Sequence, residues 1–125
     1  MKRMIIILIS ILFLAGCQTV EPLTYDDVDH LQTWSEIDGV ERGTVYVYYY
    51  STFCPACQSI SDEVLSYAGS DPDIPIYFMV SDDYRFQGSP PTTIKSIPAL
   101  LVFEDREFER MVTGAQSVVN QLQNS

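Results

Sequence analysis

Residues 44–60 read TVYVYYYSTFCPACQSI and place two cysteines between a predicted strand and a predicted helix. Residues 44–50 are β-branched or aromatic throughout, without alternation, which is typical of a strand buried on both faces. Residues 55–69 begin with a proline, which is favoured at the first position of a helix, and end with a glycine. Cys54 therefore lies where the strand ends and the helix begins, and Cys57 lies in the first helical turn.

The position of Cys54 favours reversible thiol chemistry. Unpaired backbone N–H groups at the start of a helix carry a partial positive charge, which stabilises a thiolate. Cys57 lies three residues later on the same face of the first turn and is expected to be more enclosed. Cys54 can therefore attack a disulfide to form a mixed disulfide, and Cys57 can resolve it.

A structural disulfide and half of a metal site are the alternative uses of this pair. A disulfide across two intervening residues closes almost no loop, so it would stabilise the fold little. A metal site would need two further ligands, and the only histidine, His30, is predicted to lie at the surface near the polar face of a helix. Exchange chemistry is the favoured interpretation, and we expect no metal or other cofactor.

The first 16 residues are predicted to form an export signal. Lys2 and Arg3 give a positive start, and residues 5–14 (IIILISILFL) are apolar except for one serine. This run is shorter than the about 20 residues of a transmembrane helix. The following Leu14-Ala15-Gly16-Cys17 resembles the lipobox of bacterial lipoproteins, which implies cleavage before Cys17 and a lipid on its sulfur. An ordinary secretory signal with a chance cysteine is the alternative.

Export would divide the chain into a signal peptide (1–16), a tether (17–24) and a domain (25–125). Loss of residues 1–16 takes two of the 7 basic residues and none of the 17 acidic ones, so the net charge changes from −10 to −12. This charge disfavours nucleic acid, whose phosphates need a basic surface, and disfavours contact of the domain with anionic lipid. We expect a monomer that a lipid holds on the extracytoplasmic side of a bacterial membrane, at the cell surface or in the periplasm.

The rest of the chain predicts one small α/β domain. Further predicted elements are a helix over 26–38, a strand over 74–80, a hairpin of strands 99–103 and 108–112, and a helix over 115–123. Glycine and prolines leave residues 82–96 without a predicted element. Strands that alternate with helices and end in a hairpin predict a central mixed sheet covered by helices on both faces.

The order of these motifs resembles the thioredoxin superfamily. The C-x-x-C pair between strand and helix is followed about 40 residues later by Ser96-Ile97-Pro98-Ala99-Leu100, and Val112-Thr113-Gly114-Ala115 follows near the end. The resemblance covers the chain from Tyr25 onward. It implies a thioredoxin-like fold in which Pro98 is cis and faces the cysteine pair. It also implies that the Ile97 backbone pairs with a strand of the substrate.

The active-site motif departs from that of thioredoxins. Phe53 stands where thioredoxins have Trp, and Pro55-Ala56 stands in place of Gly-Pro. The resemblance places these residues, with Ile97 and Pro98, at the substrate-binding surface. Tyr48 occupies the position, six before the first cysteine, where thioredoxins bury a carboxylate that helps deprotonate the resolving thiol. Whether the protein oxidises or reduces its partners therefore stays open.

Two functions from different classes fit these patterns. The first is a membrane-anchored, extracytoplasmic thiol–disulfide oxidoreductase that exchanges disulfides with exported cysteine-containing proteins and with a redox partner. The second is a non-catalytic accessory lipoprotein of a secretion system, with a thioredoxin-like fold and a cysteine pair that is oxidised but not cycled. Both cysteines lie at the start of a helix, where structural disulfides are rarely needed, and this favours the first function.

Overall fold

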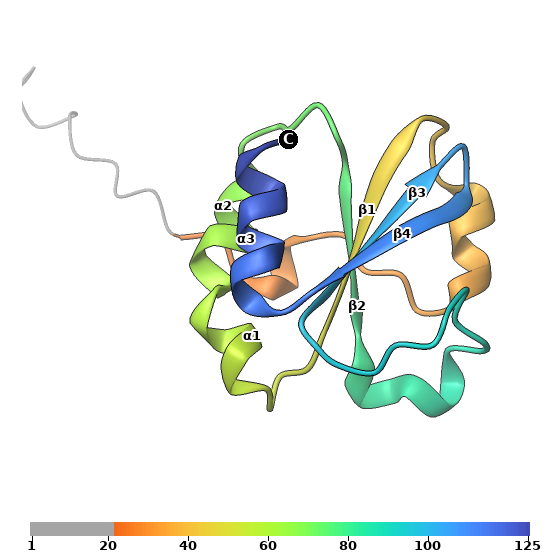
Figure 1. The fold of residues 1–125 in the computed structure, drawn as a ribbon, viewed down its shortest axis with the longest axis horizontal. Coiled ribbons are helices and arrows are strands. Elements are labelled where there is room, and N and C mark those ends of the chain that lie inside the picture. Colours follow the sequence, from red (N-terminus) through yellow and green to blue (C-terminus); the bar gives the residue numbers. More distant parts are fainter. Residues whose placement is uncertain (1–21) are drawn as a thin grey trace, which may run out of the picture.

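The computed structural model describes residues 22–125 (Figure 1). The predicted signal peptide, Cys17 and the tether as far as residue 21 lie outside the described residues. Within 22–125 no helix is long and apolar enough to cross a membrane. In chain order the elements are the 3-10 helices η1 (Tyr25–Asp27) and η2 (Trp34–Gly39), strand β1 (Thr44–Tyr50), helices α1 (Pro55–Ser59) and α2 (Ser61–Gly69), strand β2 (Ile76–Val80), the 3-10 helix η3 (Ser81–Phe86), strands β3 (Ala99–Glu104) and β4 (Glu107–Thr113), and helix α3 (Ala115–Gln123).

The four strands form one mixed sheet in the order β2-β1-β3-β4. Strands β1 and β2 are parallel, as the helical crossover between them predicts, and β1–β3 and β3–β4 are antiparallel. Figure 1 shows α1, α2 and α3 on one face of the sheet and η2 on the other. The predicted α/β class and the terminal hairpin are therefore confirmed.

Strand β1 lies in the middle of the core, because side chains on both of its faces are buried. Tyr46, Tyr48 and Tyr50 point toward the helical face and pack with α1, α2 and α3. The alternate residues face the other way and pack with Trp34 and Ile37 of η2; they are Val45, Val47 and Tyr49. The run of tyrosines is thus a core strand, as its β propensity predicts.

The helix predicted over 26–38 is wrong. Residues around His30 are extended, and His30 forms a parallel bridge with Phe78 of β2. Phe78 donates its N–H to the Asp29 carbonyl (2.9 Å) and accepts a hydrogen bond from the Leu31 N–H (2.8 Å). Pairing with the free edge of β2 therefore replaces the local helical hydrogen bonds, and only the short η1 and η2 remain on either side.

The helix predicted over 55–69 is present but divided. Ile60, with φ −113° and ψ 9°, separates α1 from α2. The Ile60 N–H still donates to the Cys57 carbonyl (3.4 Å), and its own carbonyl accepts from Val64 (3.0 Å). The break leaves α1 as one short turn of helix that carries the cysteine pair.

Two tyrosines of β1 allow a matched test of buried hydroxyl groups. The Tyr46 hydroxyl lies 2.6 Å from Ser125 Oγ and accepts a hydrogen bond from Gln121 Nε2 at 3.1 Å. The Tyr48 hydroxyl is buried and has no hydrogen-bond partner among the described residues. We expect Tyr46→Phe to lower the free energy of unfolding by about 0.5–1.5 kcal/mol. Tyr48→Phe should leave it unchanged or raise it.

Denaturant unfolding of both variants and the wild type measures this difference. Both substitutions remove one oxygen atom from side chains on the same strand and face. The two variants should therefore lose similar packing contacts and differ mainly in the hydrogen bonds they lose. Equal losses of stability in the two variants would contradict the hydrogen bonds assigned between the Tyr46 hydroxyl and Ser125 and Gln121.

Candidate active site

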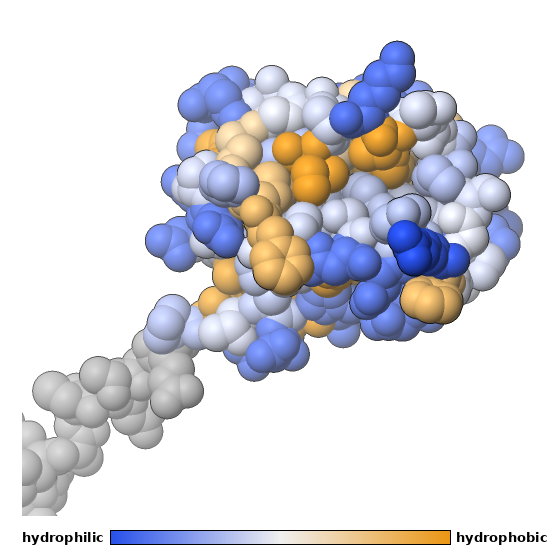
Figure 2. Space-filling view, turned by 90° about the horizontal axis from the view of Figure 1, so that it is seen from below, coloured by the Kyte–Doolittle hydropathy of each residue, from blue (hydrophilic) through white to orange (hydrophobic). Residues whose placement is uncertain are grey.

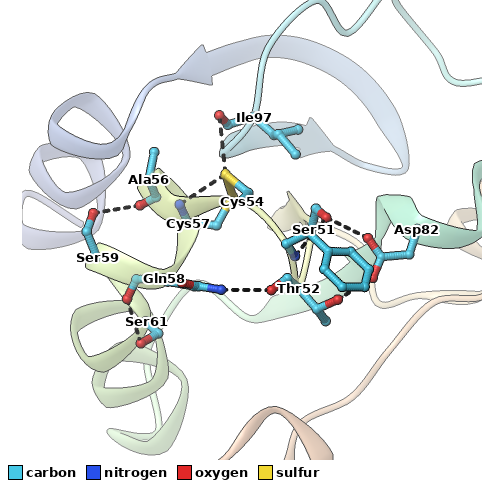
Figure 3. Close-up of a disulfide and its surroundings, with 11 residues drawn as sticks. Ser51, Thr52, Cys54, Ala56, Cys57, Gln58, Ser59, Ser61, Asp82 and Ile97 are labelled. Atoms are coloured by element: carbon cyan, nitrogen blue, oxygen red, sulfur yellow. Dashed lines mark hydrogen bonds between the residues drawn. A yellow bond between two sulfur atoms is a disulfide. The ribbon is translucent and has the colours of Figure 1, made fainter.

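The two cysteines lie at the junction of β1 and α1 (Figure 3). Their Cα atoms are 5.2 Å apart and the sulfurs are at bonding distance, so they form a disulfide. Cys54 is partly exposed, whereas Cys57 is only 1% exposed and belongs to the core. The predicted asymmetry is therefore present: an incoming group can reach Cys54 and not Cys57.

Backbone groups of α1 hold the sulfur of Cys54. Cys54 is the N-cap of α1, and the backbone N–H of Cys57 points at its Sγ at 3.1 Å. Pro55 has no N–H to offer, and the first-turn donor that bonds the sulfur is the Cys57 N–H. In the reduced protein this N–H would favour a thiolate at Cys54, because a hydrogen bond to the charged form stabilises it.

The loop before β3 lies directly against this sulfur. The Ile97–Pro98 peptide bond is cis, as the resemblance implies. The Ile97 carbonyl oxygen is 3.9 Å from Cys54 Sγ (Figure 3). Pro98 is buried, and its carbonyl accepts a hydrogen bond from the Gly114 N–H at 3.0 Å, which ties the loop to the junction of β4 and α3. Residues far apart in the sequence thus meet at Cys54.

A carboxylate fixes the turn that precedes Cys54. Asp82 accepts hydrogen bonds from Ser51 Oγ and Thr52 Oγ1, both at 2.6 Å (Figure 3). These two hydroxyl groups hold the pKa of Asp82 below its usual value. The Thr52 carbonyl in turn accepts from Gln58 Nε2 at 2.9 Å, which joins the turn to α1.

The contact of Asp82 with Ser51 and Thr52 was not predicted from the sequence. A signal was present, because these residues follow the parallel neighbours β1 and β2. The carboxyl ends of parallel strands meet at one edge of a sheet. The hydroxyl-carboxylate contact therefore follows from the topology once the strands are assigned.

Aromatic side chains are exposed next to Cys54 and in η3. Phe53 is 84% exposed, and Tyr84 and Phe86 of η3 are 60% and 81% exposed. Pro55 and Ala56 are also exposed. Figure 2 looks at this end of the molecule and shows apolar residues grouped among polar ones. Phe53, Pro55 and Ala56 adjoin Cys54 along the chain, and the role of these three residues in binding a substrate stays a prediction.

A cavity of about 460 Å³ lies behind the cis-proline loop, on the sheet face opposite α1. Ile97 lines it, so the cavity adjoins the carbonyl that faces Cys54. Its other lining residues are Trp34, Tyr49, Ser81, Tyr84, Gly88, Pro90, Ile94, Lys95 and Ser96. This volume is in the range of small-ligand pockets.

The surface position predicted for His30 is wrong. His30 is partly buried, with Nε2 2.8 Å from the Tyr50 hydroxyl and Nδ1 3.1 Å from the Val28 carbonyl. Local helical periodicity placed it at the surface, whereas the bridge to Phe78 turns it toward the aromatic core. No local pattern in the sequence signals this contact, because it joins residues 20 positions apart.

Tyr48 is fully buried, and burial is the first cause that raises the pKa of its hydroxyl group. Gln87 is the one buried polar or charged residue of the part of the chain that the structure describes, so no carboxylate is buried there. Asp62 and Glu63 of α2 are exposed. Across residues 22–125, no three His, Cys, Asp or Glu side chains are placed to bind a metal ion together.

Solved structures of thioredoxins have a similar fold. Mitochondrial thioredoxin 3 from Saccharomyces cerevisiae, in its oxidized form, superimposes with a TM-score of 0.63 at 12% identity, over 81% of this chain and 98% of that one. The fold is thioredoxin-like. Thioredoxin f from spinach chloroplast gives a TM-score of 0.58 at 13% identity, over 78% and 91% of the two chains. The thioredoxin of Malassezia sympodialis gives 0.57 at 18% identity, over 83% and 96%.

No protein-family model matches the sequence, and no curated protein sequence matches it. The likeness to thioredoxins therefore lies in the fold, which the structure confirms as predicted. The observed pairing of Cys54 with Cys57 and the cis bond at Pro98 are features of this chain's own geometry.

The contacts of Asp82 predict a pH-dependent effect on stability. A carboxyl whose folded pKa is lowered stabilises the fold above its unfolded pKa, and this contribution is lost as the pH falls through the folded pKa. We expect Asp82→Asn to lower the free energy of unfolding at pH 7 by about 1 kcal/mol or less, because the site is exposed. The difference should begin to shrink as the pH falls below about 4, the ordinary pKa of an aspartate, and should be lost once the pH is below the lowered folded pKa.

Urea unfolding at pH 7 and at acidic pH measures this effect. Asp83→Asn is the matched control, since Asp83 is the exposed neighbour in η3 and makes none of these contacts. A stability difference between wild type and Asp82→Asn that persists unchanged in acid would contradict the role assigned to the Asp82 carboxylate.

Proposed function

We propose that this chain is a thiol–disulfide oxidoreductase, anchored by a lipid on Cys17 to the extracytoplasmic side of a bacterial membrane. One observation carries the enzymatic part of the proposal. Cys54 is partly exposed, and its sulfur accepts a hydrogen bond from the Cys57 N–H and lies against the cis Ile97–Pro98 loop. Cys57, in contrast, is buried in the core. A purely structural disulfide has no need of this asymmetry.

The reaction consists of two exchanges of sulfur for sulfur. The Cys54 thiolate attacks one sulfur of a partner's disulfide, forms a mixed disulfide and releases the partner's other sulfur as a thiolate. The Cys57 thiolate then attacks Cys54 Sγ and releases the partner's remaining thiolate. The partner is reduced, and the pair becomes the disulfide. The same steps in reverse oxidise a partner dithiol, and a second redox protein restores the starting state.

The proposed substrate surface comprises Phe53, Pro55, Ala56, Ile97 and Pro98. Because the Ile97 carbonyl lies 3.9 Å from Cys54 Sγ, a peptide bonded to that sulfur brings its backbone beside Ile97. An extended segment can then pair with the loop as an added strand, while exposed Phe53 contacts its side chains. Exported proteins with cysteines supply such segments, and we propose them as substrates.

The lipid anchor is supported by the sequence at the start of the chain. The charged start, the short apolar run and Leu14-Ala15-Gly16-Cys17 occur in the order of a lipoprotein signal. Extracytoplasmic compartments permit protein disulfides, which is where an exchange enzyme has substrates. The proposed domain acts as a monomer, with no cofactor beyond its own cysteines.

Trapping in cells tests the enzymatic proposal. We expect full-length Cys57→Ser to accumulate mixed disulfides with other proteins through Cys54, because the thiol that would resolve them is missing. Non-reducing electrophoresis should show bands that a reducing agent removes, and mass spectrometry should identify their partners. Cys54→Ser is the matched control and should show none of these bands.

Absence of trapped partners in Cys57→Ser, with the protein present at wild-type level, would contradict the oxidoreductase proposal. That outcome would favour the alternative, a non-catalytic accessory lipoprotein. The direction of exchange is measured separately by the reduction potential of the pair. A value near about −120 mV would identify an oxidant, and one near about −270 mV a reductant.

Fractionation tests the anchor. We expect Cys17→Ser to move the protein from the membrane fraction to the soluble fraction or to block its processing, because the lipid-bearing sulfur is absent. Metabolic labelling with a fatty-acid analogue should label the wild type and not Cys17→Ser. Ser10→Ala, inside the apolar run, is the control and should retain both properties. Unchanged membrane attachment and labelling of Cys17→Ser would overturn the proposed anchor.

A further inference from the structure

A small cavity beside the cysteine pair takes no part in the two exchanges described above. Its lining residues are Tyr25 of η1, Tyr50 of β1, Ser51, Thr52, Cys57, Gln58 and Ser61, and we call it the tyrosine slot. Its surface is almost entirely apolar, and it is partly open to solvent. An apolar hollow that is open next to reacting sulfurs is a place where a partner can bury an apolar group.

The tyrosine slot lies on the side of Cys54 away from the cis-proline loop. In Figure 3, Ile97 is on one side of Cys54, whereas Thr52 and Gln58 are on the other. Cys57, which is bonded to Cys54, forms part of the slot wall. A peptide whose cysteine is bonded to Cys54 can therefore pair its backbone with Ile97 and place a neighbouring side chain in the slot.

The tyrosine slot has room for one side chain. Its volume is about 160 Å³, and an apolar cavity of about 150 Å³ holds a benzene molecule. Two contacts fix its walls: the rings of Tyr25 and Tyr50 are stacked at 4.4 Å, and Gln58 Nε2 donates to the Thr52 carbonyl at 2.9 Å. The slot is therefore preformed, and its walls favour a side chain made of carbon atoms along its length.

Three exposed carboxylates belong to residues at or next to the slot wall. Asp82 accepts hydrogen bonds from the two hydroxyl groups of the turn, and both of those residues line the slot. Asp26 and Asp62 each directly follow a lining residue in the sequence. All three side chains are exposed, so each can meet a charged group that enters from solvent.

The electrostatic effect of these carboxylates reaches the slot. Burial is the largest cause that raises the pKa of the Tyr25 and Tyr50 hydroxyl groups. Asp62 adds to the increase at Tyr25, and Asp82 and Asp26 add to that at Tyr50. None of the basic residues of 22–125 lines the slot; they are Arg42, Arg85, Lys95, Arg106 and Arg110. A positive charge at the slot is therefore favoured and a negative one disfavoured.

We propose that the tyrosine slot binds a lysine or arginine side chain of the substrate, from a residue close to the cysteine that bonds to Cys54. These two side chains are apolar along the stem and positively charged at the tip. The stem lies against the tyrosine rings, and the charged tip lies among the carboxylates of Asp26, Asp62 and Asp82. This inference rests on the proposed function, because it specifies which cysteine-containing segments the enzyme prefers.

Exchange with activated peptides tests the slot in the full-length reduced chain. Every protein carries Cys17→Ser so that only the pair reacts. The probes are short acetylated peptides whose cysteine is bonded through its sulfur to 2-thiopyridine. The Cys54 thiolate attacks the peptide sulfur, a mixed disulfide forms and 2-thiopyridine leaves, so its absorbance measures the rate. The peptides carry lysine, norleucine, alanine or glutamate at successive positions on either side of the cysteine.

Norleucine is the matched control for lysine, because it keeps the four-carbon stem and lacks the charge. At low salt and pH 7, we expect the lysine peptide to react about two- to fivefold faster than the norleucine peptide at the position that reaches the slot. Added salt should reduce this ratio. Alanine should react more slowly than norleucine because it lacks the stem, and glutamate should react most slowly.

Two neighbouring acidic residues separate the slot from the overall negative charge of the chain. Asp62→Asn and Glu63→Gln each remove one exposed negative charge from the first turn of α2. Glu63, however, lines a different groove, between α2 and α3. We expect Asp62→Asn to reduce the lysine-to-norleucine ratio by about half and Glu63→Gln to leave it unchanged. Asp26→Asn should act like Asp62→Asn.

Equal rates for lysine and norleucine at every position would overturn the inference. Equal effects of Asp62→Asn, Asp26→Asn and Glu63→Gln on the ratio would also overturn it, because net charge alone would then attract the peptides. Failure of the inference is distinct from failure of the proposed function. Cys54 can exchange with every peptide at the same rate and still be an enzyme, and trapping through Cys57→Ser reports on protein partners independently of the slot.

Discussion

Burial of β1 on both faces is the constraint on which the rest of the structure depends. The strand pairs with β2 on one side and β3 on the other, so its backbone is hydrogen-bonded along both edges. Its side chains form the centre of both core clusters. A strand fixed in this way delivers residues 51–57 to one end of the sheet at a defined angle. The carboxyl end of β2 and the cis-proline loop reach the same end, so the site is assembled by sheet pairing.

Segments with a strong local propensity or a clear turn signal predicted their elements well. The β-branched and aromatic run of β1, the hairpin and α3 are all found close to their predicted bounds. The helix prediction for the segment around His30 failed. Its apolar residues recur every third position, which fits a helix but also fits an extended chain flanked by short turns. Its hydrogen bonds go to Phe78, 48 residues away in the sequence. The contact forms because the edge of β2 is free to pair. A short stretch of sequence around His30 does not include Phe78, so it cannot predict this pairing.

Some residues of the candidate site could likewise be predicted from the sequence, and others could not. Cys54, Cys57 and Pro98 could be assigned from motif order, because the strand, the helix and the Ile-Pro step fix where each one lies. The contacts that support them come from tertiary packing: Asp82 under the turn and His30 behind Tyr50. Each is a single polar residue whose sequence neighbours carry no motif. Sequence patterns thus locate the two sulfurs, while the polar contacts around them become visible only in the folded chain.

The unequal exposure of the two sulfurs has a kinetic consequence. Cys54 is the one sulfur of the pair that an incoming protein can reach, since Cys57 is enclosed by the core. In the proposed enzyme, a protein that donates electrons and a protein that accepts them must use the same atom, one after the other. They cannot occupy the site together, so they compete for it. Steady-state turnover would then follow a ping-pong scheme, in which the chain alternates between two stable covalent forms and keeps its two partners apart in time.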